Sequence, residues 1–144
     1  SIINENFILN NFSNEDIIIE NFGLSDQNKK NIPFQIFESD MANTISTESL
    51  DYNFRKKDSE LIETICINSI VEKYGLLKFQ LVLDIEGEEI NVLRKNNNWL
   101  ENCHSILLEN HLPKKKLIEL NNFLISKNFN IVDKKENVFL FSKN

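Results

Sequence analysis

Apolar residues recur at every second position of the segment 77–85 and again from residue 90 onward. Alternation with a period of two is typical of a strand that buries one face. A two-residue turn between the two segments would place Leu83 opposite Ile90 and keep both side chains on that face. The pattern therefore predicts an antiparallel β-hairpin over 76–95.

Four other segments carry the signals of α-helices. The segment 58–74 is apolar almost all round and precedes Gly75, a residue suited to a left-handed helix end. A capping hydroxyl or amide followed by an acid three residues later opens two further segments, and a proline in the first turn opens the last one. The four ranges predicted to be helical are 13–22, 58–74, 98–110 and 113–127.

The rest of the chain supplies further strands. Residues 33–39 have strand composition, residues 50–54 alternate between apolar and polar side chains, and the polar segment 40–48 predicts a loop. Residues 129–142 predict a second hairpin, and because its second arm is apolar on both faces, one of its strands should be internal. We expect a single α+β domain over 1–144, in which helices cover one face of a largely antiparallel sheet of five or six strands.

The composition fits one domain of ordinary size. The chain has 144 residues, of which 41% are hydrophobic, and its 22 acidic against 16 basic residues give a net charge of −6. No segment reaches the roughly 18 consecutive apolar residues that a membrane-spanning helix needs. Two cysteines without a CxxC pair are too few for a disulfide scaffold and favour a reducing compartment. We therefore expect a cytoplasmic protein with no membrane partner.

Candidate chemical motifs are few. Cys103 and His104 are adjacent, and neighbours on a helix point about 100° apart, so they cannot act together as nucleophile and base. His104 and His111 match no zinc-binding spacing, and the three glycines are too far apart to form a phosphate-binding loop. The sequence thus predicts no catalytic residue, no cofactor and no metal site, and a protein that is not an enzyme.

Short basic runs raise the question of nucleic acid binding. They occur at 29–30, 55–57, 114–116 and 134–135, and such runs on one face could follow a phosphate backbone. Their spread along the chain and the net negative charge argue against a nucleic acid partner. The run at 114–116 is also electrostatically unfavourable, because it lies at the positive end of a predicted helix.

The predicted hairpin carries a cluster of acidic residues at its tip. Its register puts Asp84 directly opposite Glu89, and like charges in that position destabilise a strand pair by up to about 1 kcal/mol. Two interpretations remain open: water screens these charges, or they form a surface that attracts a basic partner. Trp99 is either an aromatic anchor for that partner or a core residue. The predicted partner-binding residues are Asp84, Glu86, Glu88, Glu89 and Trp99.

These observations favour a binding protein. Small, acidic α+β chains without catalytic motifs often act as immunity proteins or antitoxins, which is an analogy of class rather than of motif. We therefore expect a non-enzymatic module that neutralises a bacterial toxin, such as a basic nuclease, by covering its active surface. Two alternatives remain: an acidic secretion chaperone that binds a segment of an effector, and an enzyme whose site has no recognisable motif.

Overall fold

Two β-sheets organise the chain in the computed structural model, which describes residues 6–7, 9–10, 12–13, 17–38, 43–45 and 55–143. These elements confirm the predicted α+β class, whereas the one sheet that we expected is divided into two mixed sheets. In chain order the elements are β1 (Gly23–Leu24), β2 (Lys29–Phe37), β3 (Lys56–Ile65), α2 (Ile67–Tyr74), β4 (Phe79–Leu83), α3 (Glu89–Arg94), the 3₁₀ helix η2 (Asn97–Glu101), β5 (Cys103–Glu109), α4 (Lys114–Ser126), β6 (Phe129–Lys135) and β7 (Val138–Lys143).

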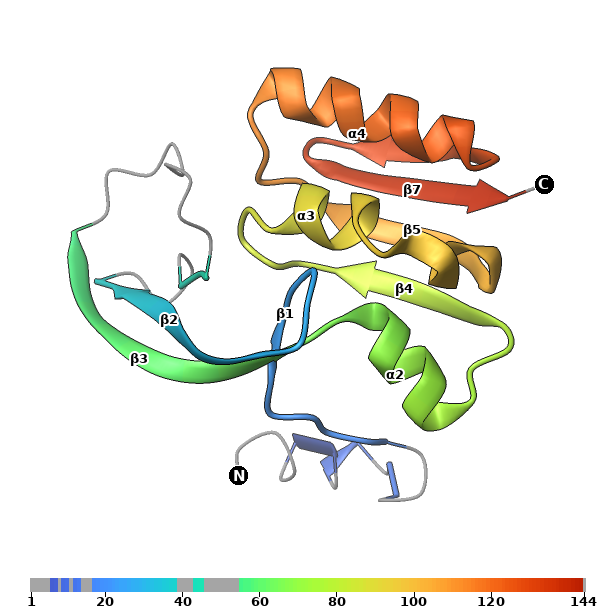
Figure 1. Ribbon diagram of the computed structural model, residues 1–144. Helices are drawn as coiled ribbons and strands as arrows, with labels where there is room; N and C mark the ends of the chain where they lie inside the picture. The colour runs from blue at the N-terminus through green and yellow to red at the C-terminus, as the bar shows by residue number, and fades with distance from the viewer. Residues whose placement is uncertain are drawn as a thin grey trace.

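The larger sheet has the strand order β4-β5-β7-β6. Strands β4 and β5 are parallel, and β7 is antiparallel to both of its neighbours. Parallel strands need a crossover connection, which α3 and η2 supply between β4 and β5. Helices α3 and α4 lie over the same face of this sheet (Figure 1).

The hydrophobic core lies between this sheet and its helices. The buried side chains of β5 and β7 alternate along each strand, as expected when one face of a sheet is covered. The buried side chains of the core include Ile106 and Leu108 of β5, Phe139 and Phe141 of β7, Val92 and Leu93 of α3, Leu120 and Leu124 of α4, and Phe129 at the start of β6. On the opposite face, Val82 is 72% exposed. No helix in the described part of the chain combines the length and apolarity that crossing a membrane would require.

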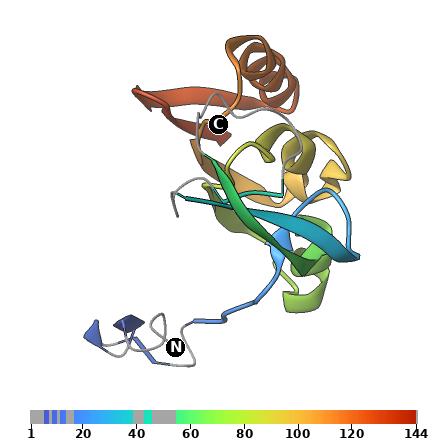
Figure 2. The ribbon, with the colours of Figure 1, turned by 90° about the vertical axis from the view of Figure 1, so that its left-hand side faces the viewer.

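The smaller sheet has the order β1-β3-β2. Strands β2 and β3 form a long antiparallel pair that curves away from the larger sheet (Figures 1 and 2). The loop after β1 attaches this pair to the rest of the molecule: Lys95 Nζ lies 3.0 Å from Asp26 Oδ2, and Asn96 Nδ2 donates to the Asp26 carbonyl at 3.0 Å. Asp26 is buried in this contact.

The helix expected over 13–22 is wrong in its described part. Residues 17–22 form neither helix nor strand, and β1 follows directly. Residues 17–19 are three isoleucines, whose branched Cβ atoms restrict χ1 and lower helix propensity. Of the cap expected at residues 13–16, residues 14–16 lie outside the described residues.

The helix expected over 58–74 is shorter than predicted. Its first half is the strand β3, which pairs with β2, and only Ile67–Tyr74 is helical. Apolar residues all round a segment fit a buried strand as well as a buried helix, so the pattern alone could not separate the two. The predicted end is confirmed, because Gly75 adopts the left-handed conformation with φ of 60°.

The hairpin expected over 76–95 is wrong. Only β4 is a strand, and the second arm is the helix α3. Leu83 pairs with Leu108 of β5 rather than with Ile90. The turn does form where expected, with positive φ angles at Glu86 and Gly87, but the chain leaves it into a crossover and not into a neighbouring strand.

The helix expected over 98–110 is also wrong. This range divides into the end of η2 and the strand β5. Burial of Ile106 and Leu108 on one face, with Leu107 on the other, follows the period of a strand. Pairing with β4 on one side and β7 on the other outweighs the local signals of a helix.

The C-terminal predictions are confirmed. Helix α4 covers nearly the whole of the predicted range 113–127, and β6 and β7 form the hairpin predicted over 129–142. The prediction that one strand of this hairpin is internal is confirmed: it is β7, which lies between β5 and β6. Strand β2 overlaps the strand predicted at 33–39. The strand predicted at 50–54, and most of the loop predicted at 40–48, lie outside the described residues.

Candidate carboxylate–histidine centre

The carboxyl ends of β4 and β5 bring four polar side chains together. Asp84 and Glu86 follow β4, Glu109 ends β5, and His111 lies two residues beyond it. Because the two strands are parallel neighbours, their carboxyl ends meet at one edge of the sheet. Ligands of open α/β sheets bind at this kind of edge.

The loop after β5 is held so that His111 points inward. Asn110 accepts a hydrogen bond from the Leu112 backbone N–H at 3.3 Å and donates one from its side-chain amide to the Leu112 carbonyl at 3.2 Å. The His111 side chain is 5% exposed. The ring is therefore fixed by its own loop as well as by its contacts.

Glu89 holds one side of the His111 ring. This glutamate is the first residue of α3, and its side chain is completely buried. Its Oε1 lies 3.0 Å from His111 Nδ1 and also accepts a hydrogen bond from the Gly87 backbone N–H at 3.2 Å. The hydrogen bond at Nδ1 leaves Nε2 as the nitrogen that faces the other carboxylates.

Three carboxylate oxygens surround His111 Nε2 without reaching it. The distances are 3.7 Å to Glu86 Oε2, 3.9 Å to Asp84 Oδ1 and 4.0 Å to Glu109 Oε1. All three exceed the length of a hydrogen bond. Asn137 Nδ2, from the β6–β7 turn, donates to Glu109 Oε1 at 3.0 Å and so fixes that carboxylate.

The centre contains buried oxygens that lack hydrogen bonds. Glu86 Oε2 and Glu89 Oε2 are both shielded from solvent, and neither accepts a hydrogen bond from the described residues. Leaving a buried polar group unpaired costs about 1–3 kcal/mol, and more for a charged group. Such groups call for a specific explanation when they occur together.

The charges of the centre perturb one another. The hydrogen bond to Glu89 raises the pKa of His111 above its usual value, burial opposes this effect, and the nearby Glu86 and Asp84 charges add to it. Burial raises the pKa of Glu86; the charge of His111 opposes that shift, and repulsion from Asp84 and Glu89 reinforces it. Perturbed groups of this kind concentrate at functional sites.

Three donor atoms of the centre lie close enough to bind one ion. They belong to Asp84, Glu86 and His111, and all lie within 4.8 Å of one another. The sequence-based expectation of no metal site remains a prediction.

The predicted binding residues do not form the expected exposed tip. Asp84, 60% exposed, and Glu86 belong to the centre, but Glu89 is buried and does not face Asp84 across a hairpin. Glu88 is also buried, and its carboxylate contacts Asn91 Nδ2 at 3.4 Å. Burial is the largest effect that raises the pKa of Glu88.

Trp99 lies in the hydrophobic core. It is 2% exposed, and its ring centroid lies 6.2 Å from that of Phe79. Of the two roles left open by the sequence, this environment fits the core residue. Its burial follows from η2, which packs it beneath the start of β4.

The spacing of the histidines argued against His111 as a metal ligand, and no sequence pattern identified Glu109. Assigning 98–110 to a helix concealed the end of β5, and with it the signal that could have identified them. The same signal occurs at the end of β4 and at the end of β5: an apolar strand, then two acidic or imidazole side chains that are two residues apart. The four side chains lie together only because β4 and β5 are parallel neighbours in the sheet.

Comparison of the chain with protein-family models, with curated proteins and with solved structures gave no match. The assignment of function therefore rests on the geometry of this molecule.

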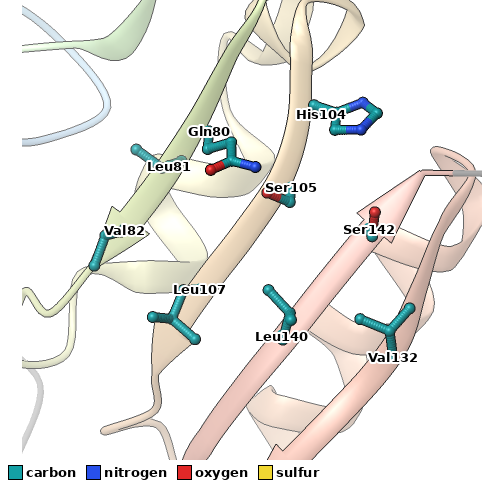
Figure 3. A pocket seen from close by; sticks show the side chains of 9 residues that line it. All are labelled: Gln80, Leu81, Val82, His104, Ser105, Leu107, Val132, Leu140 and Ser142. Carbon is teal, nitrogen blue, oxygen red and sulfur yellow. The ribbon is translucent and has the colours of Figure 1, made fainter.

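A second surface feature lies on the open face of the larger sheet. A hollow of about 490 Å³ lies there, with Gln80 and Ser105 at its polar end (Figure 3). Val82, Leu107 and Leu140 are register partners across β4, β5 and β7, so they form an apolar row across the sheet. The hollow is lined by Gln80, Leu81, Val82, His104, Ser105, Leu107, Val132, Leu140 and Ser142.

Proposed function

We propose that the chain carries the active centre of an enzyme at the carboxyl ends of β4 and β5. Its substrate is a small molecule that presents an oxygen-bearing polar group to Asp84, Glu86, Glu109 and His111. The reaction class is hydrolysis, in which the oxygen of a water molecule attacks the substrate and an alcohol departs as the leaving group after gaining a proton. This proposal departs from the non-enzymatic protein expected from the sequence, which remains untested.

The unpaired buried oxygens are the observation that carries the proposal. Glu86 Oε2 and Glu89 Oε2 have no hydrogen bond in the described residues, and carboxylates crowd around one histidine. Burial raises the pKa of Glu86, so the charged form of this carboxylate destabilises the edge of the sheet. Groups that reduce stability and converge on one point are typical of sites selected for chemistry.

The test is a turnover screen with a matched pair of histidine variants. The purified chain is incubated with carboxylic esters, phosphate esters and glycosides. We expect at least one class to be turned over by the wild type and by His104→Asn, whose ring is exposed and outside the centre. His111→Asn should lose the activity. Absence of turnover in all classes, or equal turnover by His111→Asn, would overturn the proposal.

A second candidate function is protein binding, including the immunity or antitoxin role expected from the sequence. The apolar row on the open sheet face supports it, because exposed apolar patches often mark interaction sites. The acidic residues no longer do, since Glu88 and Glu89 are buried. Val82→Lys should abolish binding to a toxin encoded beside this protein, measured by calorimetry. Unchanged affinity would exclude this face.

A further inference from the structure

The geometry points to a binding site for one divalent transition-metal cation, such as Mn²⁺ or Zn²⁺, held by Asp84, Glu86 and His111. The cation would be the group to which a substrate oxygen attaches, and in that role the inference rests on the function proposed above. The presence of the site itself is a separate matter that binding measurements can decide.

The spacing of the donor atoms fits a cation. Oxygen and nitrogen ligands lie about 2.0–2.2 Å from such an ion, so two of its ligands are at most about 4.4 Å apart. His111 Nε2 lies 3.7 Å from Glu86 Oε2 and 3.9 Å from Asp84 Oδ1, and the whole set spans no more than 4.8 Å. Asp84 is largely exposed and can close the remaining gap by rotating its side chain.

The burial of His111 and the missing hydrogen bond at its Nε2 indicate a ligand independently of the distances. Only 5% of the His111 side chain is exposed, yet Nε2 makes no hydrogen bond with the described residues. This nitrogen faces the carboxylates of Asp84 and Glu86. Glu86 Oε2, the nearest of those oxygens, is likewise buried and accepts no hydrogen bond from the described residues. A cation placed between these two atoms would satisfy both.

Glu89 completes the arrangement as a positioning residue. Histidines that bind metals usually donate their other ring nitrogen to a carboxylate or a carbonyl, which fixes the tautomer and the ring orientation. Glu89 Oε1 accepts that hydrogen bond from His111 Nδ1 at 3.0 Å. Nε2 then carries the lone pair that a metal requires.

The donor set indicates the class of cation. One imidazole and two carboxylates suit Mn²⁺, Fe²⁺ or Zn²⁺, whereas Mg²⁺ and Ca²⁺ prefer oxygen ligands alone. Three protein ligands also leave coordination positions open, as in catalytic metal sites. Glu109, 41% exposed and 4.0 Å from Nε2, lies beside the open side of the site.

The experiment is a titration of the purified full chain with Mn²⁺, followed by the loss of the electron paramagnetic resonance signal of the free ion. We expect one Mn²⁺ per chain. Asp84→Asn, Glu86→Gln and His111→Asn should each weaken binding at least about tenfold, and Glu89→Gln by about 10- to 100-fold. His104→Asn and Glu119→Gln, a histidine and a glutamate outside the centre, should bind as the wild type does.

Whether His111→Asn weakens or strengthens Mn²⁺ binding distinguishes a metal-binding histidine from a protonated histidine that neutralises the carboxylates. If His111 is instead a protonated partner of the carboxylates, removing its positive charge will strengthen Mn²⁺ binding, and the inference is overturned. Circular dichroism melting of each variant shows whether it is folded. Should His111→Asn fail to fold, Asp84→Asn, at an exposed position, gives the decisive comparison.

Cation binding and catalysis fail in different ways. If Mn²⁺ does not bind the wild type, or binds Asp84→Asn and His111→Asn equally well, the metal site is wrong, although the turnover screen can still support the centre. If Mn²⁺ binds as expected and no substrate is turned over, the metal site is confirmed and the proposed enzymatic function fails.

Discussion

Nδ1 of His111 lies 3.0 Å from Oε1 of Glu89, although 22 positions separate the two residues in the chain. One residue begins a helix and the other follows a strand, and only the β4–α3–β5 crossover brings them together. Through this contact a buried carboxylate sets which imidazole nitrogen faces Asp84 and Glu86.

Glu89→Gln should lower the pKa of His111. The hydrogen bond from the ring to Glu89 is the largest of the effects that raise this pKa, and an uncharged amide no longer stabilises the protonated ring. The measurement is an NMR titration of the histidine ring protons in the absence of added metal. The His104 resonance provides the internal control and should not move. An unchanged His111 titration would mean that the Glu89 contact does not form in solution.

Glu86→Gln should stabilise the fold at neutral pH by about 1 kcal/mol, or about 3 °C in melting temperature. The raised pKa of Glu86 means that the fold disfavours its charged form, so this carboxylate destabilises the protein above its unfolded-state pKa. The gain should disappear as the pH falls and Glu86 becomes protonated in both states. Calorimetry at neutral and acidic pH measures both effects.

The control for that variant is Glu119→Gln, which removes an exposed carboxylate 3.4 Å from Arg94. Surface pairs of this kind contribute about 0–1 kcal/mol, so the expected change is zero or a small loss. A stabilisation of the same size in both variants would show that net charge, rather than crowding at the centre, is responsible.

Leu108→Ala should destabilise the protein by about 2–5 kcal/mol, because it leaves a cavity under the helices. Leu107→Ala, the next residue of the same strand, should cost no more than about 1 kcal/mol, since Leu107 is partly exposed on the open face. Urea unfolding of the two variants checks this difference. The reverse order would place the helices on the other face of the sheet.

Asp26→Asn should destabilise the protein at neutral pH by about 1 kcal/mol. Burial alone would raise the pKa of Asp26, but the hydrogen bond and charge of Lys95 outweigh it and lower the pKa. A lowered pKa in the folded state gives stability that is present above the unfolded-state value and is lost as the pH falls through the folded-state value. The difference between wild type and variant should therefore shrink in acid, as urea unfolding at several pH values would show. A difference that persists there would exclude the charge of Asp26 as its source.

Local sequence signals predicted the helices and strands whose structure depends on residues that are close to them in the sequence. Pro113 and the apolar stripe behind it identify α4, and Gly75 marks the end of α2. The final hairpin was also predicted, since both strands lie close in sequence and the tight turn between them leaves little choice of partner. The apolar character of both faces of the second arm also predicted that one of the two strands is internal, and the structure shows that this strand is β7.

Long-range pairing was beyond the reach of these signals. Alternation over 77–95 fits a hairpin, but β4 pairs with β5, and 19 residues separate the end of one strand, Leu83, from the start of the other, Cys103. Parallel pairing places its partners far apart in sequence, and a short apolar segment carries no information on which distant strand it joins. The same ambiguity concealed β3 within a predicted helix.

The sequence by itself determined the α+β class, the turn at Glu86 and Gly87, the helix end at Gly75, and the concentration of acidic residues between 84 and 89. Only the tertiary structure decided that these acids lie around His111, with Glu89 fully buried and Asp84 still 60% exposed. The reason is physical: the strand ends that carry them converge through sheet order, and sheet order depends on burial summed over the whole fold.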